Sequence, residues 1–146
     1  MDRITAFGNQ LVITHIALRE HLARLRDGSV TGADLRAHCL TFCAVLTGHH
    51  EAEDGGGFPV LAKQYPELAP VLTELSNDHR MVEAALTRLT ELSTMDSATA
   101  RTELDTLAAL LETHFTYEER TLVAALNALR PNEEDAATVL RAVTID

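Results

Sequence analysis

The chain has 146 residues, of which 46% are hydrophobic and 4% aromatic. This length is enough for one domain with a substantial core, and the composition favours packed helices, because strands prefer β-branched and aromatic residues. The formal net charge of -10 excludes a nucleic-acid or anionic membrane partner, since both need a basic patch.

The sequence also predicts the cellular compartment. The first residues lack the apolar region of a signal peptide, and no apolar run approaches the ~20 residues that cross a bilayer. We therefore expect a cytoplasmic protein with no membrane partner. Cys39 and Cys43 are four residues apart, and we expect both to be reduced side chains rather than a disulfide.

Apolar residues recur three and four positions apart along four stretches, which is the spacing of one helix face. The first predicted helix covers about Arg3–Arg26, has Ile4 in its stripe and ends at Gly28, which suits a left-handed cap. Thr31 and Asp34 resemble a capping box and open the second helix.

The second predicted helix is interrupted by Gly55–Gly57, which we expect to form a plain loop before a short helical restart at Phe58. The third begins near Pro66, a residue suited to the first helical position. A turn is expected at Ser93–Ser97, and the fourth helix ends before Pro131.

The short connections make consecutive helices antiparallel neighbours. The predicted fold class is therefore all-α, an up-down-up-down antiparallel four-helix bundle. We expect a single domain over 1–146, with the bundle at about 3–130. The tail at 131–146 contributes one short amphipathic helix within Asn132–Val143.

Polar residues with metal-ligating side chains interrupt the apolar stripe of each predicted helix. In chain order they are His15, His49, Glu53, His79, His114 and Glu118. An unpaired buried polar group costs several kcal/mol, and a buried carboxylate costs more. Because a His and a Glu four residues later share a helix face, two such pairs and two further histidines could hold a dinuclear metal site.

Four further residues are weaker candidates. His50 and Asp54 fall one position off the inner face, so we expect them to be surface groups or to contact ligands from behind. Glu83 follows His79 by four residues but is out of line with the stripe, and Tyr117 is expected to pack against a neighbouring helix. Any of the four could instead complete the metal coordination.

The ordered ligand pattern, together with the segments HHEAEDGGGFPVLA and HIALREHL, resembles the hemerythrin-like (HHE cation-binding) domain over nearly the whole chain. The resemblance implies a non-haem diiron centre with an oxo or hydroxo bridge, in which Glu53 and Glu118 bridge the irons. Imidazole and carboxylate ligands also suit manganese or zinc. The resemblance favours iron over both.

The chain departs from the classical oxygen carriers of that family, which have a further histidine one turn before the third-helix ligand. Here that position is Leu75. Four imidazoles, two bridging carboxylates and one oxo bridge would leave about 2 of roughly 12 positions open on two octahedral irons. A fifth imidazole would leave about one. We therefore expect a centre that reacts with small ligands rather than one that holds dioxygen reversibly.

The leading functional hypothesis is a diiron protein that reacts with dioxygen, hydrogen peroxide or nitric oxide. If it is an enzyme, it is a catalase-like or nitric-oxide-reducing oxidoreductase without a catalytic residue beyond the metal ligands. Two alternatives remain open. One is a non-enzymatic carrier, sensor or store of oxygen or iron, and the other is an oxidase or oxygenase acting on an organic substrate. The sequence does not specify the redox partner.

Overall fold

The computed structural model describes residues 6–91 and 94–145. Helices and short connections account for all of these residues, and no strand occurs among them. The elements are α1 (Phe7–Arg26), α2 (Gly32–Ala52), η1 (Glu53–Gly57), α3 (Phe58–Gln64), η2 (Pro66–Leu68), α4 (Ala69–Leu89), α5 (Ser97–Ala128) and α6 (Glu133–Val143).

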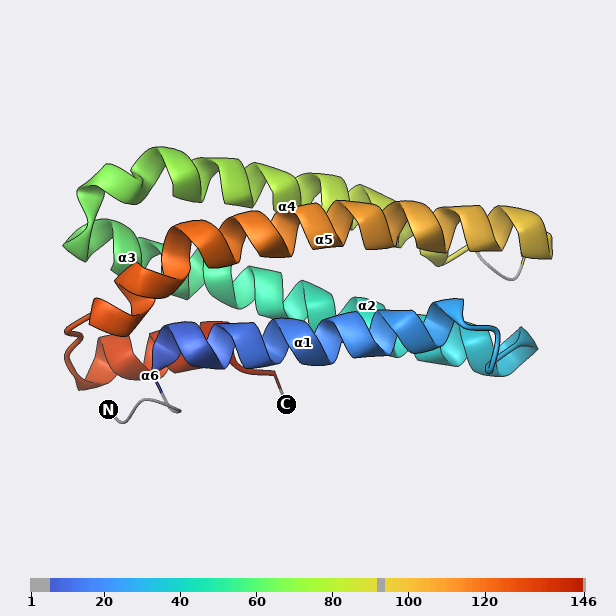
Figure 1. Cartoon of the computed structure of the whole chain (residues 1–146), viewed down its shortest axis with the longest axis horizontal. Coiled ribbons are helices and arrows are strands. Elements are labelled where there is room, and N and C mark those ends of the chain that lie inside the picture. Colours follow the sequence, from blue (N-terminus) through green and yellow to red (C-terminus); the bar gives the residue numbers. More distant parts are fainter. Residues whose placement is uncertain (1–5, 92–93, 146) are drawn as a thin grey trace.

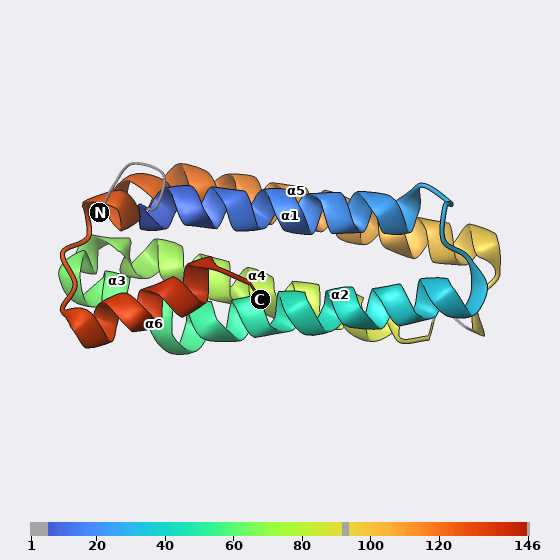
Figure 2. The same cartoon turned by 90° about the horizontal axis from the view of Figure 1, so that it is seen from below.

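Helices α1, α2, α4 and α5 lie side by side and alternate in direction (Figures 1 and 2). The predicted up-down-up-down four-helix bundle is confirmed. Three residues used in the predictions, Arg3, Ile4 and Ser93, lie outside the described residues. No helix in the described part of the chain is long and apolar enough to cross a membrane.

The ends of the helices follow the predictions in part. Gly28 adopts a φ of 81°, as expected of a left-handed cap. The prediction of a capping box at Thr31 is wrong, because the Thr31 side chain makes no hydrogen bond to the first turn of α2. Gly32 has a φ of 62°, so the backbone there departs from the geometry that brings a cap side chain onto the helix amides. At the start of α5, by contrast, Asp96 accepts a hydrogen bond of 2.7 Å from the Thr99 amide.

The expected loop at the glycines is also wrong. Residues Glu53–Gly57 form the π-helical segment η1, which joins α2 to α3 without a break. The Phe58 amide donates to the carbonyl of Glu53, five residues earlier, which is the π-helical pattern. Two of the glycines, Gly56 and Gly57, allow close packing against α6 rather than a turn. A Cβ on Gly57 would lie 2.7 Å from the Ala142 Cβ of α6.

Helix α6 confirms the helix predicted in the tail, and it packs along α1, α2 and η1 (Figure 2). Its side chains Val139, Ala142 and Val143 are buried. The Thr14 hydroxyl of α1 donates a hydrogen bond of 2.6 Å to the Val143 carbonyl. These contacts fix α6 against the bundle at the level of η1.

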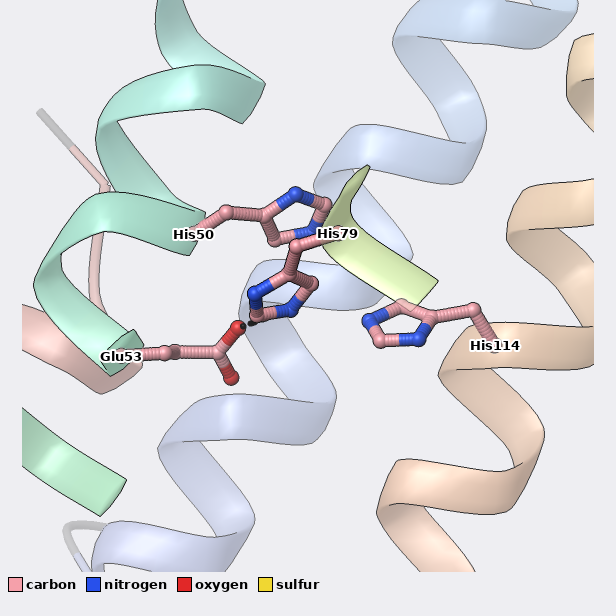
Figure 3. A group of neighbouring side chains, drawn as sticks. All are labelled: His50, Glu53, His79 and His114. Atoms are coloured by element: carbon pink, nitrogen blue, oxygen red, sulfur yellow. Dashed lines mark ion pairs between the residues drawn. The ribbon is translucent and has the colours of Figure 1, made fainter. Parts of the chain in front are cut away.

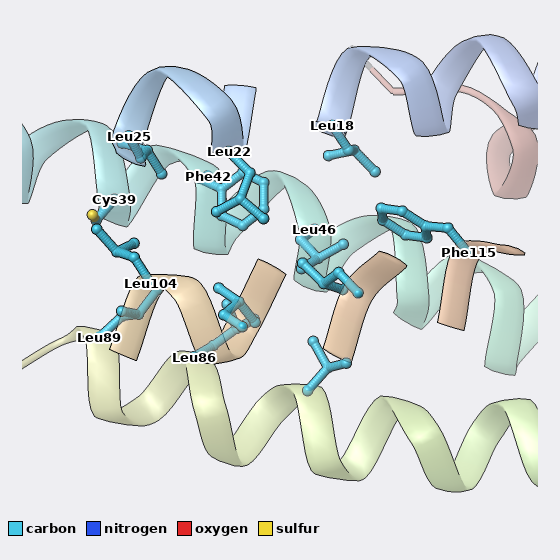
Figure 4. Packing of buried hydrophobic residues seen from close by; sticks show 13 residues of the cluster. Leu18, Leu22, Leu25, Cys39, Phe42, Leu46, Leu86, Leu89, Leu104 and Phe115 are labelled. Carbon is cyan, nitrogen blue, oxygen red and sulfur yellow. The ribbon is translucent and has the colours of Figure 1, made fainter. Parts of the chain in front are cut away.

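Buried apolar side chains form two clusters at opposite ends of the bundle. The far-end cluster, away from α6, comprises Leu18, Leu22, Leu25, Cys39, Phe42, Leu46, Val82, Leu86, Leu89, Leu104, Leu107, Leu111 and Phe115 (Figure 4). The α6-end cluster comprises Phe7, Leu11, Phe58, Val60, Leu61, Leu72, Leu75, Leu122, Leu126, Leu129, Val139 and Val143. Cys39 and Cys43 are free thiols, as predicted.

Candidate metal centre

A layer of polar side chains separates the two apolar clusters. On α1, for example, His15 lies between Leu11 of the α6-end cluster and Leu18 of the far-end cluster. The buried members of this polar layer are His15, His49, His50, Glu53, His79, His114 and Glu118. All six residues predicted as ligands therefore lie inside the bundle, and His15 and Glu118 are both 0% exposed.

The layer contains two groups of potential metal-ligating atoms. The first group is His50, Glu53, His79 and His114, whose side chains converge from η1 and three helices (Figure 3). The second group is His15, His49 and Glu118. Within each group the potential ligand atoms all lie within 4.8 Å of one another.

The carboxylates connect the two groups. Glu118 belongs to the second group, yet its Oε2 lies 3.2 Å from Nε2 of His114 in the first. Glu53 belongs to the first group, and its Oε1 lies 3.7 Å from Nε2 of His49 in the second. Each carboxylate therefore reaches imidazoles of both groups.

Many polar atoms of the layer lack hydrogen-bond partners. Nine buried side-chain atoms of the described residues have no hydrogen-bond partner. They are Nε2 of His15, His50, His79 and His114, both ring nitrogens of His49, Oε1 of Glu53 and both carboxylate oxygens of Glu118. Leaving a buried donor or acceptor unpaired costs about 1–3 kcal/mol, and more for a charged group. Imidazole and carboxylate are ligands of iron, manganese and zinc, so this donor set fits metal ions.

Three imidazoles of the layer are hydrogen-bonded at Nδ1 to a carboxylate. The pairs are His15 with Glu119 (2.7 Å), His79 with Asp54 (2.9 Å) and His114 with Asp78 (3.0 Å). A carboxylate accepts a hydrogen bond from Nδ1–H, so the neutral imidazole carries its lone pair at Nε2. The second nitrogen of a metal-bound histidine is usually held by a carboxylate, carbonyl or water in this manner.

Two of these carboxylates were not predicted from the sequence. Asp78 directly precedes His79, and Glu119 directly follows Glu118, so each is adjacent to a residue that was predicted. Adjacent helix positions point about 100° apart, and each carboxylate therefore turns to a neighbouring helix. Glu119 is in turn held by Arg19, whose Nη1 donates a hydrogen bond of 3.0 Å to it.

His50 is the main departure from the sequence analysis. It is 6% exposed, so the expectation of a surface group is wrong, and its ring stacks on His79 at a centroid distance of 3.8 Å. The reason is that α2 has two neighbours in the bundle. His49 turns toward His15 of α1, while His50 turns toward His79 of α4.

The other weak candidates lie outside the two groups. Asp54 holds His79 at Nδ1 and also accepts a hydrogen bond of 2.6 Å from the Ser76 hydroxyl. Glu83 is exposed. The Tyr117 hydroxyl donates a hydrogen bond of 2.6 Å to Glu74 of α4, which agrees with the expected packing against a neighbouring helix.

Burial governs the protonation of the layer. Burial, reinforced by the nearby Glu118 carboxylate, raises the pKa of Glu53 well above its usual range. Burial lowers the pKa of His49 to about 3 and also lowers the pKa of His50. These two imidazoles are therefore neutral near pH 7, which is the state that binds a metal ion.

A small apolar cavity of about 10 Å³ lies beside the carboxylates of Glu53 and Glu118. Its walls include Leu11 and Phe58, and Ala142 of α6 closes it. A volume of this size is close to the minimum for one water molecule.

The family model described as the hemerythrin HHE cation-binding domain matches residues 9–126. This range includes every residue of the two groups and ends before α6. Neither a curated protein nor a solved structure matches the chain.

Proposed function

Because this chain belongs to the family of hemerythrin HHE cation-binding domains, we propose that its polar layer binds two iron ions that react with dioxygen, hydrogen peroxide or nitric oxide. One observation carries the proposal. Nine buried polar atoms without hydrogen-bond partners converge in two adjacent groups of histidine and carboxylate side chains. Two cations would offset the cost of burying them.

The two groups support an assignment of ligands. We propose that His50, His79 and His114 hold one iron and that His15 and His49 hold the other. The carboxylates of Glu53 and Glu118 would bridge the irons, because each lies close to imidazoles of both groups. Asp54, Asp78 and Glu119 would keep three of the imidazoles in the required tautomer.

The number of imidazoles bears on the kind of reaction. Iron in this setting supplies one-electron chemistry between its ferrous and ferric states, together with open positions for small ligands. Five imidazoles, two bridging carboxylates and one oxo or hydroxo bridge would fill about 11 of roughly 12 octahedral positions. About one position would remain open, on the iron held by His15 and His49, rather than the two expected from four histidines.

This count favours a second candidate function beside the first. Five imidazoles equal the number that the resemblance assigns to the classical oxygen carriers, although His50 here comes from a different helix than their additional histidine. A reversible carrier or sensor is therefore the alternative to a catalyst. The cavity beside Glu53 and Glu118, of about 10 Å³, is too small for an organic substrate, so an oxygenase would have to use the pocket of about 540 Å³ that borders His49.

Anaerobic titration with ferrous iron tests the proposal. We expect two irons per chain, with visible absorption that responds to dioxygen, peroxide and nitric oxide added separately. Repeated turnover of peroxide or nitric oxide would identify a catalyst, and an oxygen adduct that is lost under vacuum would identify a carrier. Fewer than two irons per chain would contradict the proposal.

Variants test the bridging role. Glu53→Ala is expected to bind fewer than two irons, whereas Glu20→Ala, which removes an exposed carboxylate of α1 outside both groups, is expected to bind both. Retention of both irons and of all reactivity in Glu53→Ala would contradict the bridging assignment.

A further inference from the structure

Two surface pockets reach the polar layer, and they differ in charge. The first pocket lies between α2 and α4, has a volume of about 90 Å³ and is lined by His50 and His79 at its inner end. The second lies between α2 and the C-terminal residues, has a volume of about 540 Å³ and reaches His49. A surface pocket therefore borders the layer on two sides, one for each group of ligand atoms.

The first pocket is acidic. Its rim carries the carboxylates of Glu51, Asp54 and Glu83 and the guanidinium of Arg80, so three negative groups face one positive group. Among the described residues, the lining of the second pocket contains Arg141 and no carboxylate. The charges of the two described linings therefore favour the first pocket over the second for an approaching cation.

Two of the three carboxylates are available to a visiting cation. Asp54 already accepts hydrogen bonds from His79 and the Ser76 hydroxyl. The side chains of Glu51 and Glu83 are exposed, and neither makes a hydrogen bond or ion pair within the described ranges. Their charges are therefore not neutralised by a partner in the protein.

A buried ligand atom lies at the inner end of the same pocket. His50 is only 6% exposed, lines the pocket and has an unpaired Nε2. Its ring stacks on His79 at 3.8 Å, so the pocket leads directly to the first group of ligand atoms. A cation that leaves the carboxylates at the rim would find this imidazole next.

We propose that the pocket between α2 and α4 is the route by which divalent cations enter the centre, with Glu51 and Glu83 as the outer site and His50 as the first inner ligand. The inference rests on the proposed function, because it assumes that the polar layer binds metal. Charged side chains at the mouth of a cleft raise association rates by about 10- to 1,000-fold in strongly focused cases. Two exposed carboxylates should raise the association rate by a factor near the lower end of this range.

Uptake of cobalt(II) by metal-free protein, followed by its absorbance in a stopped-flow instrument, tests the route. Circular dichroism would first verify that the metal-free protein is folded. In Glu51→Gln/Glu83→Gln we expect uptake about 3- to 10-fold slower at low salt, with two cations still bound at the end. The difference should shrink at high salt, because salt screens exposed charges.

The matched control is Glu20→Gln/Glu91→Gln, which removes two exposed carboxylates away from both pockets. It is expected to change the uptake rate by less than about 2-fold, since its charges lie outside the focusing pocket. Equal slowing in the two double variants would overturn the proposal, because only the net charge would then matter.

A second pair of variants tests the route without a change of charge. Thr47→Phe adds bulk to the first pocket, and Ala44→Phe adds the same ring to the second. We expect slower uptake at every salt concentration in Thr47→Phe alone. Slower uptake in Ala44→Phe alone, or wild-type rates in both variants, would overturn the route. The proposed function would still stand in that case, provided that two cations are bound at the end. A wild-type protein that takes up no cobalt and no iron would remove both.

Discussion

The polar layer and the far-end cluster are built from the same four helices and are buried to the same extent, yet they hold opposite kinds of side chain. Phe42 and Leu107 of the far-end cluster are 0% exposed, and so are His15 and Glu118 of the polar layer. The helix face therefore decides which positions are buried, and the residue type decides what burial costs. Apolar side chains gain about 25 cal/mol per Å² of buried area, whereas the polar layer gains stability only when its charges are compensated.

This contrast predicts that the two regions respond differently to truncation and to chelation. Removing metal should weaken the polar layer and leave the far-end cluster unchanged. Removing apolar volume should weaken the far-end cluster without affecting the ligands.

The largest effect is expected for Leu107→Ala in the far-end cluster. Truncating a fully buried leucine leaves a cavity and lowers the free energy of unfolding by about 2–5 kcal/mol. Urea unfolding with and without chelator should give the same loss, and metal analysis should still find two ions per chain. Loss of metal in Leu107→Ala would show that the two regions are not independent.

Glu118→Leu is expected to raise the free energy of unfolding of the metal-free protein, whereas Leu107→Ala lowers it. Replacing a buried carboxylate whose oxygens have no hydrogen-bond partner by an apolar side chain should raise the free energy of unfolding of the metal-free form by about 1–4 kcal/mol. The same change should abolish binding of the second metal, so that added iron no longer raises the melting temperature to the wild-type value.

The control for this variant is Glu20→Leu, which makes the same replacement at an exposed position of α1. It should change stability by no more than about 0.5 kcal/mol and leave metal binding intact. A Glu118→Leu variant that is less stable than the wild type in chelator would contradict the view that this layer is costly without metal.

The sequence predicted some residues of the polar layer and missed others. A single stripe per helix located His15, His49, His79 and His114, because polar residues interrupted an otherwise regular apolar period. The same criterion missed His50, since a helix in a bundle faces two neighbours and presents more than one inner position. Contacts between helices, such as that of Asp78 with His114, depend on the register of α4 against α5, which no local pattern specifies.

The glycine segment shows a second limit of local patterns. Three consecutive glycines are typical of a loop in an isolated peptide. In the folded chain Gly56 and Gly57 lie against α6 within a continuous helical path, and their lack of side chains leaves room for α6. The sequence predicted α6 itself, but not that it would pack against this segment.

Gly57→Ala tests how α6 packs over the polar layer. The new methyl group would lie 2.7 Å from the Ala142 Cβ, so α6 must shift. We expect a loss of about 1–3 kcal/mol in the free energy of unfolding, as for other overpacked sites.

Two controls isolate this contact. Gly55→Ala meets no atom within 4 Å and should be neutral or stabilising by up to about 1 kcal/mol. Combining Gly57→Ala with Ala142→Gly should recover part of the loss, giving a coupling energy in a double-mutant cycle. Strict additivity of the two changes would exclude a direct contact between η1 and α6.

The smallest expected effect on the stability of the metal-free protein is that of a residue which holds a ligand rather than serving as one. Asp78→Asn keeps the size of the side chain but removes the charge that holds Nδ1 of His114 at 3.0 Å. Loss of such a partner costs about 10- to 100-fold in metal affinity. Competition with a coloured chelator would measure the affinity. The control Asp105→Asn, at a carboxylate paired with Arg26 in the far half of the bundle, should leave the affinity unchanged.

Because Asp78 contacts no apolar cluster residue through this bond, the stability of the metal-free protein should change far less than the metal affinity. Equal losses in both would mean that Asp78 stabilises the bundle as a whole rather than the orientation of one imidazole.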